Sequence, residues 1–349
     1  MDALTDRVGA TAWSLSWIPS NSVSGVLRRG FDVGLSHYDR PPADVIADAA
    51  ALDHLRAADA FRFANVIGGW AEVLDRRITD AGFSTDAGLL MGSTTVRLAR
   101  LGATFRGFSL PVLRSGPDYA PDSRSVTLVQ TVGGRTGVPL PRPVPQPPFV
   151  QWQAPIVWTT LVLTLHADGR SQVALRSASA FPRHWVYGAD GVLIAKSGLT
   201  DQDSWVGHSF GYNTPWGGET STVVVATAES SLERQLSTEL MQAGHEPVVR
   251  RLDAGSIVTV QGEPGNEIFL VLDGTLAVEV DGKRITQVGP GAVLGERAVL
   301  EGGLRTSTLV ATTAVRLAVA PVDAIDMDRL RALADLHRHE DPQPAGTSG

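Results

Sequence analysis

An acidic and a basic residue stand nine positions apart in a stretch of small residues, GAVLGERAVLEGGLRTSTLVA, that spans residues 291–311. Glu296 follows Gly295, and Arg305 precedes Thr306 and two further hydroxyl residues. A guanidinium is planar and permanently charged, so it can bind two oxygens of one phosphate. A carboxylate instead accepts a hydrogen bond from a hydroxyl group. The pair predicts a site for a sugar phosphate or nucleotide, and the alternative is an ordinary surface ion pair beside glycine turns.

The element that must position these groups is a short helix. The segment ERAVLEG after Gly295 can form one or two helical turns. The free amides at a helix start favour an anion, and small neighbouring residues let the anion come close. We therefore expect the phosphate to lie at the start of this segment.

The segment LGERAVLEGGLRTST resembles the phosphate-binding cassette of the cyclic nucleotide-binding domain family. It follows the family's order of Gly-Glu, any residue, Ala, two aliphatic residues, a variable stretch, Arg, two small residues and Thr. The upstream GEPGNEIFLVLDGTLAVEVDGKRITQVGPG is similar to the family's strands, including Gly265, Gly274 and Gly289. The resemblance covers residues 248–341 and implies a β jelly-roll domain with flanking helices.

The resemblance assigns a role to each ligand-binding residue. Arg305 would bind the cyclic phosphate, and Glu296 would bind the ribose 2′-hydroxyl. The backbone amides of Arg297 and Ala298 would complete the phosphate cradle, with Thr306 nearby. The sequence departs from the family pattern at two positions, which we expect to alter loop rigidity and affinity: Leu304 replaces the usual proline, and Arg297 replaces the usual aliphatic residue.

The identity of the purine depends on Thr306. A hydroxyl directly after the arginine is found in guanine-preferring members of the family and also in related bacterial adenine binders. We expect cyclic AMP, with cyclic GMP as the alternative, as a regulatory ligand, and we expect no cofactor.

In this family the ligand draws in the hinge that follows the cassette. The predicted helix over residues 323–339 would then close over the base, with Leu330, Leu333 and Leu336 as candidate lid residues. Such a closure requires that the ligand bind one arrangement better than the other. The alternative is that these leucines pack in the core.

Composition limits the function classes. The chain has 349 residues, a formal net charge of −7 and no cysteine. A net acidic chain argues against a nucleic-acid partner, and the absence of cysteine excludes thiolate chemistry and favours a reducing, cytoplasmic compartment. The N-terminal residues do not resemble a secretory signal. The longest apolar run, residues 154–165, is too short to span a membrane and predicts a buried strand.

Length and pattern predict two mainly β domains with some helix. We expect a β-rich (α+β) effector or interaction domain over residues 1–220, a connecting helix over 221–244, a cyclic nucleotide-binding domain over 245–341 and a disordered tail over 342–349. Leu232, Leu236 and Leu240 share one face of the connecting helix. We expect no DNA-binding helix pair after the nucleotide domain.

Turn residues predict the local pairing of strands. Asp-Gly pairs at 168–169 and 190–191 lie between apolar runs and predict hairpins. Two more pairs, at 273–274 and 281–282, predict a three-stranded antiparallel meander. The proline-rich stretch 142–150 predicts an extended crossing between sheets, and a helix is expected to begin near Pro42.

Polar residues in the first domain do not form a recognisable catalytic pattern. The candidates are His37, Asp39, Arg183, His184, Asp201, Asp203 and His208. Their spacing matches no metal-ligand motif, so we predict neither a catalytic residue nor a metal site there.

Three hypotheses follow for the whole chain. In the first, it is a signalling receptor in which the nucleotide allosterically regulates an N-terminal domain that engages a protein partner. In the second, the N-terminal domain is an enzyme or a β-barrel for an apolar molecule, lined by its tryptophans. In the third, the cassette is degenerate and purely structural. The oligomeric state, including a homo-oligomer, is left open.

Overall fold

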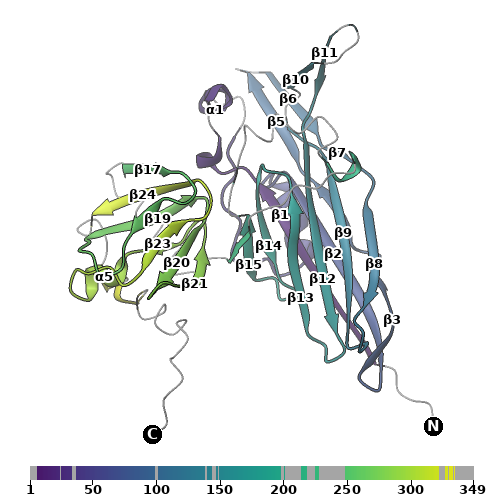
Figure 1. The fold of residues 1–349 in the computed structure, drawn as a ribbon. Coiled ribbons are helices and arrows are strands. Elements are labelled where there is room, and N and C mark those ends of the chain that lie inside the picture. Colours follow the sequence, from purple (N-terminus) through teal and green to yellow (C-terminus); the bar gives the residue numbers. More distant parts are fainter. Residues whose placement is uncertain are drawn as a thin grey trace. The chain divides into compact units, whose positions relative to one another are not determined.

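The structure is a computed structural model of the 349-residue chain. It describes residues 6–23, 25–33, 37–98, 101–137, 140–143, 147, 149–197, 200, 214–217, 225–227, 248–321, 327–328, 330–332 and 334. The chain divides into two compact units, residues 1–223 and 224–349. The described residues are mainly strands in both units (Figure 1).

Unit 1 contains two antiparallel sheets. The first has the order β15-β14-β1-β2-β3 within this unit, with β4 also paired to β2, and the second has the order β13-β12-β9-β7, with β8 also paired to β9. The strands of the first sheet are β1 (Asp6–Trp17), β2 (Phe63–Leu74), β3 (Arg77–Phe83), β4 (Gly88–Met91), β14 (Arg183–Tyr187) and β15 (Leu193–Ser197). Those of the second are β7 (Phe108–Ser109), β8 (Leu113–Tyr119), β9 (Ser125–Arg135), β12 (Ile156–His166) and β13 (Ser171–Ala178).

The remaining elements of unit 1 are short. Two further hairpins are formed by β5 (Ser93–Leu98) with β6 (Leu101–Arg106) and by β10 (Leu140–Pro143) with β11 (Val150–Gln153). The helices are α1 (Gly25–Asp32) and α2 (Ala49–Ala57), with 3-10 turns η1 (Ser20–Ser22) and η2 (Pro215–Gly217).

The two sheets pack face to face because side chains alternate along β1 and β12. Ser14 on β1 points inward and hydrogen-bonds Thr159 on β12 at 3.0 Å. Asn65 donates to the same threonine, and its amide oxygen accepts a hydrogen bond from Gln130. This polar layer lies in a core that also buries Leu128, Leu161, Leu163 and Leu165 completely or nearly so. Buried polar groups are tolerated here because they bond one another.

Several predictions for unit 1 are confirmed. The apolar run 154–165 is the buried strand β12. The Asp-Gly pairs at 168–169 and 190–191 join β12 to β13 and β14 to β15 as antiparallel hairpins.

Three features of unit 1 differ from the sequence-based expectation. The proline-rich stretch belongs to the β10–β11 hairpin and does not cross between sheets, since Leu140 pairs with Gln153. The helix expected from Pro42 begins instead at Ala49, where the Asp48 carboxylate accepts the Ala51 amide at 2.9 Å and caps the helix start. The central strand β1 was not predicted.

Unit 2 contains two four-stranded antiparallel sheets, β17-β24-β19-β22 and β18-β23-β20-β21 (Figure 1). The strands are β17 (Val248–Leu252), β18 (Ile257–Thr259), β19 (Glu267–Asp273), β20 (Leu276–Val280), β21 (Lys283–Val288), β22 (Val293–Leu294), β23 (Thr308–Ala311) and β24 (Val315–Pro321). The short helix α5 (Glu296–Leu300) follows β22. This arrangement has the two-sheet architecture of the predicted jelly roll.

Alternation along β19 divides the core of unit 2 in two. Phe269 and Val271 pack with Leu276, Leu309 and Leu317 in the cluster between the sheets. Ile268, Leu270 and Leu272 form a second cluster on the other face of β19, where Leu330 covers them. Because both faces of β19 are buried, its sequence is a continuous apolar run.

The predicted meander is wrong in one respect. The Asp281-Gly282 turn does join the antiparallel pair β20–β21. The Asp273-Gly274 turn instead carries the chain from one sheet to the other, since β19 pairs with β24 and β22. An Asp-Gly turn specifies a tight reversal, and tertiary packing decides whether the flanking strands then pair.

Two predicted segments fall largely outside the described residues. Of the connecting helix over 221–244, the structure describes Val225–Thr227, which forms strand β16. The tail 342–349 also lies outside the described residues.

Candidate functional site

The site centres on the buried side chain of Arg305. Its Nη1 donates a 2.8 Å hydrogen bond to the backbone carbonyl of Glu267. Its guanidinium lies over the Phe269 ring, 5.1 Å from the centroid. Burial lowers the pKa of Arg305 from its ordinary value, and the carboxylates of Glu267 and Glu296 oppose that shift. The protein therefore holds a desolvated cation against an apolar ring, an arrangement in which an added anion would bind strongly.

Two glycines make room for this guanidinium. A Cβ on Gly265 would stand 1.9 Å from Arg305 Nε. A Cβ on Gly295 would stand 2.6 Å from Nη1 and 2.7 Å from the Glu267 carbonyl oxygen. Gly295 also has φ of 91°, a left-handed conformation that favours glycine. Both positions therefore require glycine for the arginine to lie where it does.

Glu296 is the first residue of α5 and is only 4% exposed. Arg297 and Ala298 follow within the same helical turn, so their amides belong to the helix start. Ala298 is buried, and the Arg297 side chain lies 3.8 Å from the Glu301 carboxylate. The sequence-predicted residues from Gly295 to Ala298 thus form one compact turn on the end of β22.

Backbone hydrogen bonds pin the Arg305 segment against the loop before β19. Arg305 N–H donates to Glu263 O, and Gly262 N–H donates to Arg305 O, both at 2.8 Å. Gly265 N–H donates to Gly303 O, also at 2.8 Å. The two loops therefore form a ladder that fixes the arginine backbone.

The hydroxyl residues after Arg305 differ in their surroundings. Thr306 and Ser307 are half-buried. The Thr308 hydroxyl accepts a 3.0 Å hydrogen bond from the backbone N–H of Gln261, which holds the start of β23. Thr306 remains the predicted ligand contact of the three.

The candidate lid residues divide between described and undescribed parts of the chain. Leu330 is fully buried against β19, with Ile268 and Val293 among its neighbours. Leu333 and Leu336 lie outside the described residues. In this structure Leu330 covers the face of β19 opposite to Phe269.

Sequence reasoning missed two parts of the site. Phe269 was assigned only to a strand, and the Glu267 carbonyl gave no signal in the sequence. The glycine at 265 was noted as part of the resemblance, without its contact to Arg305. A strand residue two positions after an acidic residue carries no distinctive pattern, so only packing reveals it.

In unit 1, Asp39 and Arg62 form a buried ion pair. Arg62 Nε and Nη2 donate to the two Asp39 carboxylate oxygens. Asp39 Oδ2 also accepts the Ile18 amide at 2.8 Å. His37 lies at the edge of this pair, with Nε2 3.2 Å from Arg62 Nη2. The cluster joins the loop before α2 to the first sheet.

His184 is fully buried between strands. Its Nδ1 lies 2.7 Å from Ser16 Oγ, and its Nε2 lies 2.8 Å from the Ser179 carbonyl. Burial lowers the pKa of His184 to about 4. The neighbouring Arg183 lies with Nε 3.4 Å from the Thr200 hydroxyl. Asp201, Asp203 and His208 lie outside the described residues. The residues that the structure describes contain no cluster of three potential metal ligands.

The geometry is thus a two-sheet jelly roll with a short helix and a buried arginine beside the helix start. Residues 249–327 match the family model described as the cyclic nucleotide-binding domain. This part of the chain is therefore a cyclic nucleotide-binding domain, as its resemblance implied.

Relatives of this domain occur in channels and kinases. The chain is 37% identical over 68 residues to a cyclic nucleotide-gated potassium channel of Mesorhizobium japonicum, covering 20% of this chain and 19% of the channel. It is 32% identical over 106 residues to a cGMP-dependent protein kinase of Caenorhabditis briggsae, covering 30% of this chain and 14% of the kinase. It is 28% identical over 82 residues to a cAMP-dependent protein kinase regulatory subunit of Yarrowia lipolytica, covering 24% and 21%. The chain thus spans about a fifth or less of these relatives.

Solved structures with similarity include cAMP-bound PfPKA-R, at 25% identity and a TM-score of 0.22, covering 26% of this chain and 33% of that chain. The N-terminal domain of a transcriptional regulator from Streptomyces coelicolor matches at 22% identity and a TM-score of 0.24, covering 33% of this chain and 89% of that chain. Among the residues that the structure describes, no helix is long and apolar enough to cross a membrane.

Proposed function

We propose that the C-terminal domain binds a cyclic nucleotide through Arg305 and Glu296, and that this binding regulates the N-terminal unit. The observation that carries the first part is the buried guanidinium of Arg305, held by Phe269 and the Glu267 carbonyl. Burying a cation is costly unless an anion compensates it. A cyclic phosphate would supply that anion and also accept the amides of Arg297 and Ala298.

The second ligand contact is the ribose. Glu296 is buried beside the same turn, where its carboxylate can accept a hydrogen bond from a 2′-hydroxyl. A carboxylate would repel the phosphate directly, so the two charged side chains are expected to bind opposite ends of the sugar phosphate. Retention of both side chains, each buried, supports a working site over a degenerate one.

The preferred ligand is cyclic AMP, and Thr306 is the residue on which the choice depends. The names of the relatives include both cAMP-dependent and cGMP-dependent kinases. We further propose a cytoplasmic receptor, without catalysis of its own, whose residues 1–220 engage a partner.

The experiment is calorimetric titration of the full chain with cyclic AMP and cyclic GMP. We expect micromolar or tighter binding of at least one nucleotide. Arg305→Ala should weaken it by about 100-fold, since loss of a buried charge-assisted contact costs about 3 kcal/mol. Arg305→Lys keeps the charge but loses the planar guanidinium, so its nucleotide affinity should lie between those of the wild type and Arg305→Ala.

The ribose assignment has its own control. The wild-type protein should bind the 2′-deoxy analogue of its preferred nucleotide more weakly than the nucleotide itself, and Glu296→Gln should reduce that preference. Binding of neither nucleotide, or unchanged affinity in Arg305→Ala, would refute the site.

Regulation of unit 1 requires a separate readout. Hydrogen exchange of unit 1 with and without the nucleotide should show altered protection if the ligand shifts a conformational equilibrium. Unchanged exchange throughout residues 1–220 would contradict regulation while leaving nucleotide binding intact.

A further inference from the structure

The strand β13 ends its sheet in the described part of the chain. The order β13-β12-β9-β7 gives β13 a partner strand on the β12 side alone among the described residues. Its first four residues, Ser171–Ala174, alternate between half-buried and exposed. An edge strand presents backbone donors and acceptors that can pair with another extended chain.

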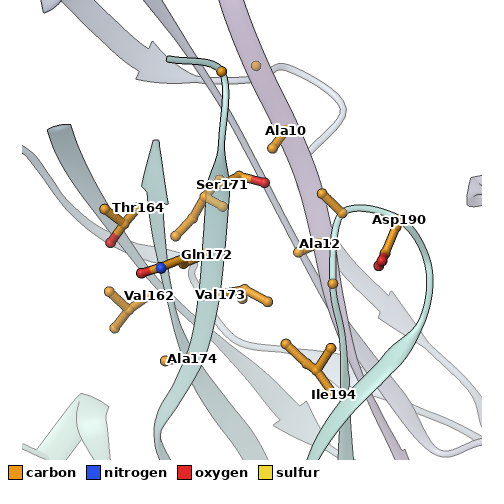
Figure 2. Close-up of a pocket in the computed structure, with 15 residues that line it drawn as sticks. Ala10, Ala12, Val162, Thr164, Ser171, Gln172, Val173, Ala174, Asp190 and Ile194 are labelled. Atoms are coloured by element: carbon orange, nitrogen blue, oxygen red, sulfur yellow. The ribbon is translucent and has the colours of Figure 1, made fainter. Parts of the chain in front are cut away.

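A cavity of about 790 Å³ lies along this edge (Figure 2). Thr164 and Gln172 face it together as one cross-strand pair, and Val162 and Ala174 as the next. Figure 2 shows Ser171 and Val173 on the other side of β13, toward β1. The cavity, here called the β13 groove, therefore reaches both faces of the strand at its edge.

The opposite wall of the groove is another open strand edge. β14 pairs with β1 from Trp13 to Trp17, and in the described structure no strand pairs with Asp6–Ala12 on that side. Ala10 and Ala12 of this stretch line the groove. The turn after β14, with Asp190, closes the wall. Because walls stand on both sides, the space admits a single extended chain more readily than the edge of a second folded domain.

The other edge of the same sheet is protected in a way that β13 is not. β8 contains Arg114, Pro117 and Asp118, and its pairing with β9 shifts register between Ser115 and Asp118. Charge, proline and irregular pairing are the usual means of blocking edge-to-edge association. Ser171–Ala174 contains no charge and no proline, and its pairing with β12 is regular. Within the part of the chain that the structure describes, this contrast marks β13 as an edge left open.

The groove also carries a charge signal. Among its lining residues Asp190 is the only ionisable one. Its Oδ1 accepts the Val192 amide at 3.1 Å, which holds the carboxylate at the turn. A basic side chain on the incoming chain would complement it.

We propose that the β13 groove binds an extended segment of a partner protein by strand addition to Ser171–Ala174. The segment would lack proline, present small or apolar residues toward Ala10, Ala12 and Val173, and place a lysine or arginine near Asp190. Backbone pairing supplies affinity in this mode, and the alternate side chains supply specificity. Four residues of strand span about 13 Å, so the motif is short.

The test uses the full chain and a display library of random ten-residue peptides, with Ala10→Leu protein as the counter-selection. Ala10→Leu places extra bulk in the groove without altering the β13 backbone. Ala120→Leu, at a half-buried site between β8 and β9, is the matched control for added bulk. Thermal melts and circular dichroism verify that each variant is folded.

Enriched peptides should alternate apolar residues, lack proline and carry lysine or arginine at one end. Measured by fluorescence polarisation, the best of them should bind Ala10→Leu at least ~10-fold more weakly than wild type and Asp190→Asn about 3-fold more weakly. Ala120→Leu should bind as wild type does. A proline placed in the centre of the peptide should abolish binding.

Three results would overturn the proposal. The first is enrichment of peptides without alternation, or of none. The second is equal binding to wild type and Ala10→Leu. The third is a concentration-dependent dimer, seen by sedimentation, that Ala174→Pro dissolves, because a second copy of this chain would then be the occupant. None of these readouts depends on cyclic nucleotide binding.

Discussion

A methyl group on Gly265 would stand 1.9 Å from Nε of Arg305, so the loop before β19 and the arginine of the cassette fit only if residue 265 is glycine. The two residues lie forty positions apart in the sequence. Their close approach links Arg305, the proposed phosphate-binding residue, to the backbone hydrogen bonds that hold it.

Gly265→Ala should therefore weaken nucleotide binding by about tenfold or more, because the guanidinium must move by more than an ångström. The domain should stay folded, since the flexible end of a side chain can shift more easily than the backbone. Calorimetry and thermal melting would measure the two effects. Gly88→Ala is the control, because a Cβ there meets nothing within 4 Å. Undiminished binding in Gly265→Ala would show that the arginine position is not needed.

Phe269→Leu should weaken nucleotide binding about 2- to 5-fold, since it removes the ring under a partly desolvated guanidinium. It should also cost about 1–2 kcal/mol of domain stability, because Phe269 is a core residue. Val271→Ala removes apolar volume from the same cluster without touching Arg305, and it should lower stability alone. Equal effects of the two variants on nucleotide affinity would contradict a role for the ring.

The buried His184 should make the stability of unit 1 depend on pH. Its pKa in the folded protein is lowered to about 4 from 6.5. As pH falls below 6.5 the unfolded chain binds a proton that the folded chain does not, so stability is present above pH 6.5 and is lost toward pH 4. The loss should approach about 3 kcal/mol. Denaturant unfolding of the full chain at a series of pH values would measure it.

His184→Gln provides the comparison. It should be less stable at pH 7, because it disturbs the bonds to Ser16 and Ser179, and its stability should fall less steeply between pH 6.5 and 4. An identical slope in both proteins would assign the pH dependence to other groups.

Arg62→Ala should destabilise the protein by about 3–5 kcal/mol, because it leaves the buried Asp39 carboxylate without its cation. Asp39→Leu combined with Arg62→Met should be less damaging than Arg62→Ala, since it removes the Asp39 carboxylate together with its cation. A double-mutant cycle of Asp39→Leu, Arg62→Met and their combination, monitored by chemical denaturation, would give the coupling free energy between the two side chains. Additive single effects would show that the pair contributes little.

The cassette was predictable because its proposed ligand groups lie within twelve residues and follow one pattern, from Gly295 to Thr306. The hairpin turns at 168–169 and 190–191 were predictable for a similar reason, since turn preference is local. The missing Asp273 hairpin shows the limit of such signals, because the turn is correct and the strand pairing is not.

The amino-acid pattern alone therefore identified the cyclic nucleotide-binding domain and was the basis for predicting which residues bind phosphate and ribose. The fold of residues 1–223 depended on contacts across long separations, such as Ser14 with Thr159, which lie 145 residues apart. Nothing local encodes such pairs, because each side chain is chosen for a neighbour that only the folded sheets bring near. The Phe269 ring under Arg305, the close approach of Gly265 to Arg305 and the edge position of β13 among the described strands were decided by tertiary structure for this reason.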